Sequence, residues 1–404
     1  MNDTLILLTD SFPYGIKETF LEAEIGFLST TFKSVHIFPL HGSGEYRPQA
    51  ANVTVHPPFL SFHTKNQKQL FVSGLCNTSP FRFAIKEFWE KSIYKNAAQI
   101  RVWMAATLVF RAAYSNRLRI SELKSLIDNN SVVYSYWGDK LALMIPFLSK
   151  NAPFKNIVRF HRTDLYEEFK GGYIPFRSLL LPGVGHFAFI SEDGKNYLEK
   201  QYPAWVHNAH ICRLGVFDNG INPLNNTSVF HLVSCSYMVS VKRIPLLIAA
   251  LQQVTCKVKW THIGLGTEYD RIRNLANQLP ENIDVEVLGE RSNQEVLAYY
   301  ASTPIDLFVN VSESEGVPVS IMEARSFGIP GMATAVGGTA EIVDDTVGKL
   351  LPVNISAQQL AEEIEAFCAS TQATNKRITA RARWAERCDA VKNYREFAEF
   401  TSTI

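Results

Sequence analysis

The sequence has few cysteines, almost no net charge and no long hydrophobic run, and each shortage excludes a class of protein. Its six cysteines are scattered over 404 residues and none forms a Cys-x-x-Cys pair. Neither a zinc site nor a disulfide framework is therefore indicated. Such cysteine usage is typical of a reducing compartment. A formal net charge of +1 gives no general attraction to nucleic acid, which we do not expect as a partner.

The hydrophobic runs are too short to cross a bilayer. The longest uncharged run near the middle covers residues 102–110, whereas a spanning helix needs about twenty apolar residues. The apolar run 5–8 near the N-terminus is broken by Thr9 and Asp10 and follows no basic segment. This is not the pattern of a signal peptide, and we expect a cytoplasmic protein.

Short apolar runs alternate with amphipathic segments along the whole chain. This alternation is typical of parallel sheets that are covered by helices on both faces. The length favours two domains, and we expect two Rossmann-like, doubly wound domains that face each other across a cleft. The strand candidates are residues 5–9, 34–38, 132–136, 156–160 and 186–190, then 230–235, 258–264, 284–289, 305–311 and 331–335.

The domain boundary is expected in residues 217–228, which are rich in Asn, Gly, Pro and Ser. The N-terminal domain then covers residues 1–216 and the C-terminal domain residues 217–389. The tail 381–404 has the pattern of one amphipathic helix, and its part from about 390 to 404 is expected to pack back on the first domain. In open α/β sheets, ligands bind at the carboxyl ends of the strands.

The segment 312–330 carries two glutamates around a predicted helix start. Pro318 suits the first helical turn, and Gly328-Ile329-Pro330 ends the helix. The amides and dipole of a helix N-terminus bind phosphate. Glu315 and Glu323 cannot hold a phosphate, so we expect them to accept hydrogen bonds from hydroxyls on either side of it, as in a nucleotide sugar. The alternative is a pair of surface acids that stabilise a helix dipole.

These residues belong to a longer segment with a specific resemblance. Residues 312–351, SESEGVPVSIMEARSFGIPGMATAVGGTAEIVDDTVGKLL, resemble the donor-binding signature of retaining GT-B glycosyltransferases of family 4, including its Glu-x7-Glu motif. VSCSYMVSVKRIPLLIAAL, WTHIGLGTEYDRI and VLGERSNQEVLAYY resemble earlier parts of the same domain. FPYGIKETFLEAEIGFL, RFHRTDLY and FISEDGKNYL resemble the N-terminal domain of bacterial polysaccharide members. The resemblance thus covers most of the chain.

The resemblance implies roles for residues of the second domain. Glu315 would contact the donor sugar and Glu323 the ribose hydroxyls. The family places an Arg and a Lys six positions apart to neutralise the diphosphate; here Lys242 is kept and Ser236 replaces the arginine. Adjacent Arg243 is the candidate that compensates. The remaining implied donor contacts are the diphosphate-binding amides around Gly316, Val319 and Ser320, the turn residues Val317 and Pro318, and the base-facing loop with Gly289 and Arg291.

In the first domain, His161 follows the strand 156–160 and resembles the family's active-site histidine. It would contact the donor sugar near the anomeric centre; the alternative is a structural histidine. Gly15 would give the backbone room near the diphosphate or the acceptor, or is an ordinary turn glycine. The further candidates for the acceptor or the cleft are Glu18, which could instead start the first helix, Trp137, which could be core, and Arg162 and Asp164.

The stretch 65–124 is basic and aromatic. It holds eleven Lys or Arg against three Glu, a net charge of +8, and nine Phe, Trp or Tyr residues. Basic and aromatic residues interleaved on helices can lie on an anionic membrane surface. The alternative is a solvated face over an aromatic core. We expect peripheral contact with the inner face of the plasma membrane through this stretch.

The resemblance implies a retaining glycosyltransferase that moves a hexose from a UDP- or GDP-sugar to a glycan or lipid-linked oligosaccharide. The product would be a cell-surface polysaccharide such as O-antigen, capsule or exopolysaccharide. No cofactor and no metal are expected, because no Asp-x-Asp pair stands in a suitable loop. A nucleotide-sugar epimerase and a non-catalytic binding subunit remain alternatives. The dinucleotide fingerprint fails, since Tyr269 stands where its last glycine belongs.

Overall fold

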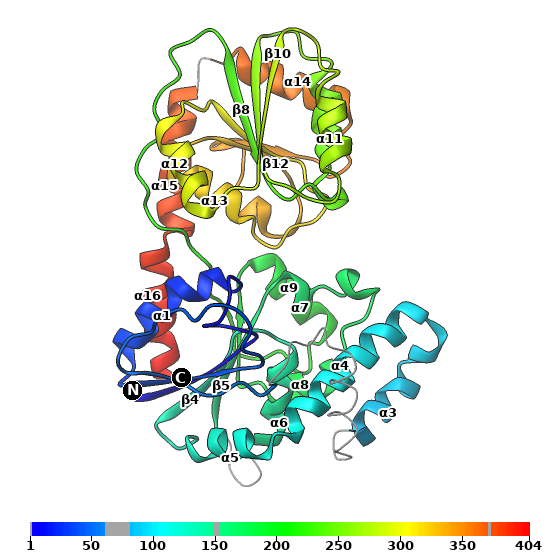
Figure 1. Cartoon of the computed structure of the whole chain (residues 1–404), viewed down its shortest axis with the longest axis vertical. Helices are drawn as coiled ribbons and strands as arrows, with labels where there is room; N and C mark the ends of the chain where they lie inside the picture. Colours follow the sequence, from blue (N-terminus) through cyan, green and yellow to red (C-terminus); the bar gives the residue numbers. More distant parts are fainter. Residues whose placement is uncertain (1, 61–80, 149–153, 371–372) are drawn as a thin grey trace. The chain divides into compact units, whose positions relative to one another are not determined.

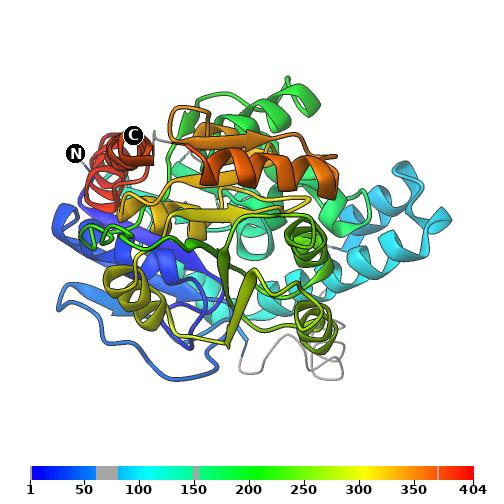
Figure 2. The same ribbon diagram turned by 90° about the horizontal axis from the view of Figure 1, so that it is seen from above.

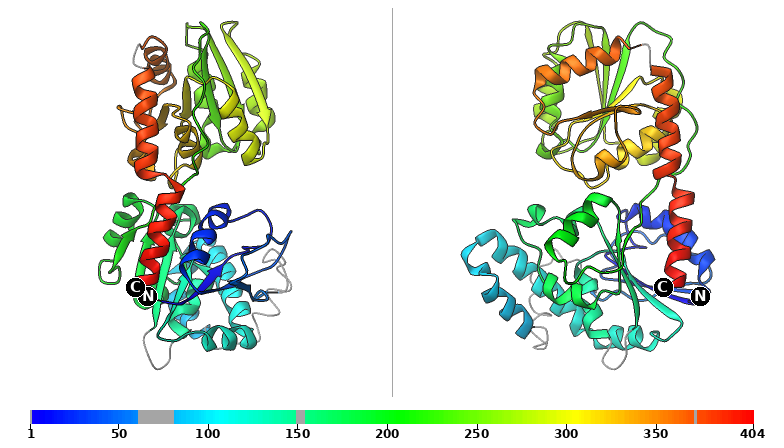
Figure 3. Two further views of the ribbon diagram at one scale, coloured as in Figure 1. Left: turned by 90° about the vertical axis from the view of Figure 1, so that its left-hand side faces the viewer. Right: turned by 180° about the vertical axis from the view of Figure 1, so that it is seen from behind.

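The computed structural model describes residues 2–60, 81–148, 154–370 and 373–404. Its internal contacts divide the chain into two compact units (Figure 1). Unit 1 consists of Met1–Leu214 and Lys392–Ile404, and unit 2 of Gly215–Val391. The two ends of the chain lie side by side in unit 1 (Figure 3), where the Asn2 side chain donates hydrogen bonds to the carbonyls of Ser402 and Ile404.

Within the described residues, unit 1 is built on a seven-stranded parallel sheet of order β3-β2-β1-β4-β5-β6-β7. Its strands are β1 (Thr4–Thr9), β2 (Ser34–Pro39), β3 (Val53–Val55), β4 (Ser131–Ser135), β5 (Lys155–Phe160), β6 (His186–Phe189) and β7 (Ala209–Ile211). Its helices include α1 (Thr19–Thr31), α3 (Phe81–Glu90), α4 (Ala97–Ser115), α5 (Arg117–Ser125), α6 (Ile145–Leu148), α7 (Arg162–Leu165), α8 (Arg177–Leu180), α9 (Glu192–Gln201) and α16 (Ala390–Thr403).

Both faces of this sheet are covered because successive side chains of a strand point to opposite faces. Leu5 and Leu7 of β1 pack in one cluster with Leu28 of α1 and Phe397 of α16. Ile6 and Leu8 lie in the other cluster, which contains apolar residues of α4, α5, α6, α8 and α9. Such continuous apolar strands are typical of a parallel sheet buried on both sides.

Unit 2 repeats this architecture with a six-stranded parallel sheet of order β10-β9-β8-β11-β12-β13 in the described part of the chain. The strands are β8 (Phe230–Cys235), β9 (Val258–Ile263), β10 (Ile283–Gly289), β11 (Leu307–Asn310), β12 (Gly331–Thr334) and β13 (Gly348–Leu351). The helices are α10 (Ile244–Leu251), α11 (Tyr269–Ala276), α12 (Asn293–Ser302), α13 (Val319–Ser326), α14 (Ala357–Cys368) and α15 (Ala373–Arg387). Two short 3-10 helices, Ser240–Lys242 and Gly337–Glu341, lie in the loops of the described part of this unit.

The helices of unit 2 divide between the two faces of its sheet. Leu232 and Leu307 pack with residues of α10, α11 and α14. Val233 and Phe308, their neighbours in sequence, pack with residues of α12, α13 and α15. The sheet is therefore doubly wound, as the sequence predicts.

Each sheet has one point where the strand order reverses. In unit 1, β1 pairs with β2 on one side and with β4 on the other. In unit 2, β8 lies between β9 and β11. Ligands of doubly wound sheets bind beside the carboxyl ends of the strands at this switch point. The loops to consider are thus those after β1 and β4 and those after β8 and β11.

All ten predicted apolar runs are strands, but three strands were missed. β3 and β7 have only three residues each, which is too short for an alternation to be recognised. β13 reads Gly-Lys-Leu-Leu, with little β-forming character at its start.

Two helix predictions need correction. The tail is not one helix, because α15 ends at Arg387 and α16 begins at Ala390. Pro318 is the N-cap of α13 rather than a residue of its first turn. No helix among the described residues combines the length and apolar character that crossing a bilayer requires.

Candidate functional site

The switch-point loops of unit 2 bring two predicted residues into contact. Lys242 ends the 3-10 helix after β8, and Glu315 lies in the loop after β11. Lys242 Nζ is 2.5 Å from Glu315 Oε1, and the Asn310 amide donates a 3.3 Å hydrogen bond to the same oxygen. The carboxylate is 7% exposed and the lysine side chain 17%, so the ion pair is largely shielded from water.

The loop that carries Glu315 is fixed by a glycine turn. Gly337 has a φ of +51°, and a Cβ there would lie 2.1 Å from the Glu315 carbonyl oxygen. The Gly338 amide donates a 2.6 Å hydrogen bond to the Gly316 carbonyl. Only glycine at 337 permits this approach, so the turn after β12 determines where the loop after β11 lies.

Glu323 sits in a different environment from Glu315. It is 9% exposed, and its Oε1 accepts a 2.5 Å hydrogen bond from Asn293 Nδ2 at the start of α12. Burial raises the pKa of Glu323 to about 7, although the Asn293 hydrogen bond opposes this. Near neutral pH this carboxyl is poised between its two protonation states.

Asn293 and Asn310 are site residues that the sequence reasoning missed. Each donates a side-chain hydrogen bond to one of the two glutamates. The sequence could have indicated the place of Asn293, because Ser292 and Glu295 form a capping box that marks the start of α12 at this residue. Asn310 had no such signal, since it ends an otherwise apolar strand.

Arg243 is not directed at the Lys242–Glu315 pair. Its guanidinium donates 2.7 Å hydrogen bonds to the carbonyls of Val311 and Val353 and a 3.4 Å hydrogen bond to the Ser312 carbonyl. The sequence predicts that Arg243 compensates for the missing arginine. In the structure its guanidinium is already hydrogen-bonded to backbone carbonyls. Ser236 lies at the predicted place, where its amide donates to the Ile263 carbonyl.

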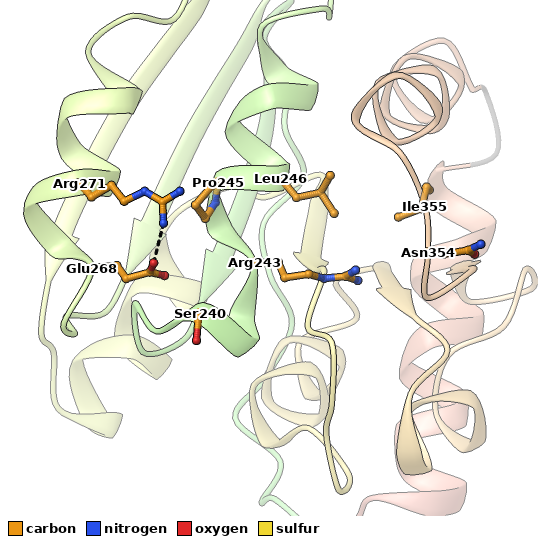
Figure 4. A pocket seen from close by; sticks show the side chains of 8 residues that line it. All are labelled: Ser240, Arg243, Pro245, Leu246, Glu268, Arg271, Asn354 and Ile355. Atoms are coloured by element: carbon orange, nitrogen blue, oxygen red, sulfur yellow. Dashed lines mark hydrogen bonds and ion pairs between the residues drawn. The ribbon is translucent and has the colours of Figure 1, made fainter. Parts of the chain in front are cut away.

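Arg243 also lines a cavity of about 380 Å³ beside α10 (Figure 4). In this view Arg243 points toward the segment that carries Asn354, while Arg271 pairs with Glu268 at 2.8 Å. The wall is completed by Ser240, Pro245, Leu246, Asn354 and Ile355. Because its two arginines have partners, the cavity has no unpaired cation to offer an anion.

The predicted base-facing loop is only partly organised. Gly289 has a φ of +70° and ends β10, and its carbonyl accepts a 2.8 Å hydrogen bond from the Gly264 amide. Arg291 is exposed, and its guanidinium donates to the Glu290 carbonyl next to it. The predicted diphosphate contacts Gly316, Val317, Pro318, Val319 and Ser320 follow one another into the first turn of α13.

In unit 1, His161 lies at the carboxyl end of β5 between two aromatic rings. Its ring centroid is 4.7 Å from that of Tyr136 and 4.5 Å from that of Trp137. Burial, followed by the charge of Arg159, holds the pKa of His161 well below its usual range. The imidazole is therefore neutral near pH 7, with two ring nitrogens that have no hydrogen-bond partner in the described structure.

Glu18 stands directly before α1, which fits the alternative that it starts the first helix, and its role toward an acceptor stays a prediction. Its carboxylate accepts hydrogen bonds from the amides of Asp10, Ser11 and Phe12 at 2.9, 2.8 and 2.6 Å. A fourth comes from the Trp137 indole at 2.7 Å. Glu18 has a φ of +56° at the N-cap of α1. Glu18 thus ties the loop after β1 to the loop after β4, and it fixes the Trp137 ring that packs against His161.

Asp164 is likewise internal rather than exposed to a ligand, and the expectation that it lines the site is wrong. It is 0% exposed and accepts from the amides of His161 and Gly138 at 2.7 and 2.5 Å. Burial raises the pKa of this carboxyl, and Asp139 adds to the effect. Asp164 therefore joins the loops after β4 and β5.

Two other predicted residues of unit 1 make local contacts. The Arg162 guanidinium lies 4.0 Å from the centroid of the Phe169 ring. The loop 43–45 packs directly against Gly15. The Gly15 amide donates a hydrogen bond to the Glu45 carbonyl, and a Cβ on Gly15 would lie 3.0 Å from the Ser43 carbonyl oxygen. Their roles toward a ligand stay predictions.

The described part of the basic, aromatic stretch contains helices α3, α4 and α5, of which α3 and α4 lie side by side at the edge of unit 1 (Figure 2). Lys65 and Lys68 lie outside the described residues. Trp89 is 62% exposed and Leu118 63%. The other exposed basic or large apolar side chains are Arg82, Ile85, Lys86, Lys91, Tyr94, Lys95, Arg101, Met104 and Arg117. Glu90 is exposed as well and forms a 3.7 Å ion pair with Lys86.

Comparison with known proteins shows the class of this fold. Residues 223–384 match the family model of glycosyl transferases group 1. The solved structure of Anabaena Alr3699/HepE in complex with UDP covers 99% of this chain and all of its own, with a TM-score of 0.67 and 17% identity. The lipopolysaccharide outer core galactosyltransferase WaaB has a TM-score of 0.69 at 12% identity and covers 98% of this chain and 99% of its own. The chain therefore has the GT-B fold.

Curated relatives match over a smaller part. The Escherichia coli (strain K12) protein WcaL, named for colanic acid biosynthesis, is 30% identical over 144 residues, which are 34% of this chain and 35% of WcaL. Its Salmonella typhimurium counterpart is 28% identical over 160 residues, 38% of this chain and 39% of its own. The match thus spans little more than a third of these relatives. Together with the family model, it supports a GT-B glycosyltransferase.

The Glu18 arrangement yields a test of loop positioning. Glu18→Gln replaces a carboxylate that accepts four hydrogen bonds with a weaker neutral acceptor. We expect the amides of Asp10, Ser11 and Phe12 to exchange hydrogen roughly tenfold faster, as measured by hydrogen exchange and mass spectrometry. Glu22→Gln, on the exposed side of the same helix, is the control. Unchanged exchange in this loop would show that Glu18 does not hold it.

Proposed function

We propose that the protein is a glycosyltransferase that takes its sugar from a UDP-sugar and builds a cell-surface polysaccharide. The observation that carries this proposal is the meeting of Lys242 and Glu315 from the two switch-point loops of unit 2. A cation and an acid sit there beside the N-terminus of α13, whose first amides have no acceptor within the helix. This combination suits a diphosphate that is joined to a hydroxyl-bearing sugar.

UDP is the preferred nucleotide because Alr3699/HepE, which shares the fold over the full chain, is a UDP complex. In the proposed complex, Lys242 and the α13 amides bind the diphosphate and stabilise the charge that develops when it departs. Glu315 accepts hydrogen bonds from the donor sugar, and Glu323 from the ribose. These groups supply the charge neutralisation themselves, so we propose a reaction without a metal.

The remaining parts of the proposal rest on the sequence resemblance. It implies a member of family 4, a hexose as the transferred sugar, and retention of the anomeric configuration. The acceptor hydroxyl would attack from the face that the diphosphate leaves, and a phosphate oxygen would take its proton. The role of His161 toward the donor sugar stays a prediction. A lipid-linked oligosaccharide is the proposed acceptor, in line with the names of WcaL and WaaB.

The central experiment compares UDP with UDP-sugars by calorimetry on two variants. Lys242→Met should weaken both ligands by roughly tenfold to a hundredfold, because it removes a hydrogen bond to a charged group worth about 1.5–3 kcal/mol. Glu315→Gln should weaken the UDP-sugar alone and leave UDP bound as tightly or more so, since it removes a negative charge beside the diphosphate.

Lys259→Met, which removes a surface ion pair with Glu286, is the control and should change neither affinity. Equal loss of UDP and UDP-sugar in Glu315→Gln would contradict the sugar-binding role. Conversion of the UDP-sugar in the absence of any acceptor would indicate an epimerase instead. If the UDP-sugar binds but no sugar is transferred to any acceptor in the mixtures tested, the result would favour a non-catalytic subunit.

The Glu323 environment predicts a pH dependence. With its pKa raised to about 7, the carboxyl is protonated below that pH and charged above it, and the charged form accepts both ribose hydroxyls. UDP-sugar affinity should therefore rise between about pH 6 and pH 8 and then level off. A UDP-sugar is suited to this test because it lacks the terminal phosphate that titrates near pH 6.

The Glu323→Gln variant should bind more weakly at pH 8 and lose this pH dependence. Glu313→Gln, an exposed neighbour in the same region, should keep it. If the Glu323→Gln profile retained the parent's rise, the titrating group would lie elsewhere.

We propose further that the α3–α5 surface contacts an anionic membrane. Its exposed Trp89, Tyr94 and Leu118 can enter the lipid headgroup region while the surrounding lysines and arginines meet anionic lipids. Phe110, by contrast, is buried in unit 1, so only part of the aromatic content is available. This would place the enzyme on the inner face of the plasma membrane, next to a lipid-linked acceptor.

Sedimentation with phosphatidylserine-containing vesicles tests this contact. We expect Trp89→Ala combined with Lys91→Gln to reduce the bound fraction at least severalfold, since each lysine contributes about 1 kcal/mol near an anionic surface. Neutral vesicles should bind little. Tyr237→Ala, which removes an aromatic residue 70% exposed in unit 2, is the matched control. Equal binding of both variants would rule this surface out.

A further inference from the structure

Two thiols of unit 2 that the proposed reaction does not use lie against each other. Cys256 Sγ and Cys368 Sγ are 2.9 Å apart, and both cysteines are free and partly buried. Cys256 lies in the connection between α10 and β9, and Cys368 is the last residue of α14. They are 112 positions apart in the sequence, so sequence spacing gives no hint of the pair.

The backbone on both sides of the pair is held in place. The Thr255 amide and hydroxyl donate hydrogen bonds of 2.7 and 2.6 Å to Glu365 Oε1, one turn before Cys368. The Asn282 side chain donates a 3.0 Å hydrogen bond to the Cys256 carbonyl. Because the sulfurs of a disulfide are about 2.05 Å apart, closure needs them to approach by less than about 1 Å. The hydrogen bonds on both segments hold the two sulfurs close enough for this closure.

We propose that Cys256 and Cys368 form a thiol-oxidation site that closes to an intramolecular disulfide when the protein meets a low-molecular-weight disulfide. The Cys256 thiolate attacks one sulfur of the reagent and releases the other as a thiolate. Cys368 then attacks the Cys256 sulfur of this mixed disulfide and releases the second reagent thiolate. The two protein thiols lose two electrons and two protons, and the reagent disulfide is reduced to two thiols.

The environment orders the two steps. Burial, with the Cys256 thiol as the next contribution, raises the pKa of Cys368, so little of Cys368 is thiolate at neutral pH. It therefore acts as the resolving thiol, whose attack is helped by proximity. Glu365 has a positioning role, because it tethers the segment that carries Cys256.

The site lies away from the proposed donor loops. Cys256 precedes β9, which begins at Val258, so it stands at the amino ends of the strands. Lys242 and Glu315 follow strands and stand at the carboxyl ends. The crosslink would tie α14 to the edge of the sheet where the strands begin, and it should leave the response to UDP unchanged.

The test oxidises the full chain with oxidised glutathione and maps its disulfides by mass spectrometry without reduction. We expect two of the six thiols to be lost per chain and a peptide pair that joins residues 256 and 368. The crosslink closes a long loop, so the thermal unfolding temperature should rise by about 5–10 °C and return on reduction. The UDP-induced thermal shift should be the same before and after oxidation.

Four variants make the result decisive. Cys256→Ser and Cys368→Ser should each abolish the linkage and the rise in unfolding temperature, whereas Cys235→Ser should keep both. Glu365→Gln should slow closure severalfold without preventing it. Glutathione that stays on one cysteine, or a linkage that involves Cys76, which is outside the described residues, would overturn the proposal. Mapping of the unsubstituted protein decides the matter even if a variant fails to fold.

Discussion

The contact between Lys242 and Glu315 depends on a backbone approach that only glycine allows. A Cβ on residue 337 would collide with the Glu315 carbonyl oxygen. The Gly338 amide donates a hydrogen bond to the carbonyl of Gly316, the next residue. A similar approach occurs between the loops after β8 and β9, where a Cβ on Gly264 would lie 2.0 Å from the Ser236 carbonyl. The carboxyl edge of unit 2 is thus a set of interlocked turns. Its charged side chains are placed by main-chain geometry.

Unit 1 organises its carboxyl edge by another means. There, buried carboxylates bind backbone amides of neighbouring loops: Glu18 holds three amides after β1, and Asp164 holds those of His161 and Gly138. A buried acid without such donors would be costly. With them, it fixes loops that come from different strands. The side chains that a ligand could meet, such as His161, are held by these buried acids.

This difference explains which predictions the sequence could support. The ten predicted strands and the two doubly wound sheets follow from the apolar runs, and the place of Glu315 before α13 and of Glu323 within it follows from a motif whose spacing is local. Glu18 and Asp164 were placed near the right loops, but their contacts with Trp137 and Gly138 come from distant segments and could not be predicted. The Cys256–Cys368 contact depends on tertiary packing alone, whereas Asn310 stands only five residues before its partner Glu315 but ends an apolar strand. Nothing in their local sequence distinguishes them from other polar or apolar residues.

The two glutamates of the Glu-x7-Glu motif differ in the groups that face them. Glu315 has a lysine at 2.5 Å, and a diphosphate that binds Lys242 would compete with it for the same cation. Glu323 has only an amide donor and is held near neutrality by burial. Hydroxyls from a ribose would add donors to a carboxylate that lacks them and so favour its charged form. In the proposed donor complex, Glu315 would lose its lysine partner to the diphosphate, whereas Glu323, eight residues later, would gain hydroxyl donors. A ligand with phosphates in the middle and hydroxyls at both ends satisfies both at once.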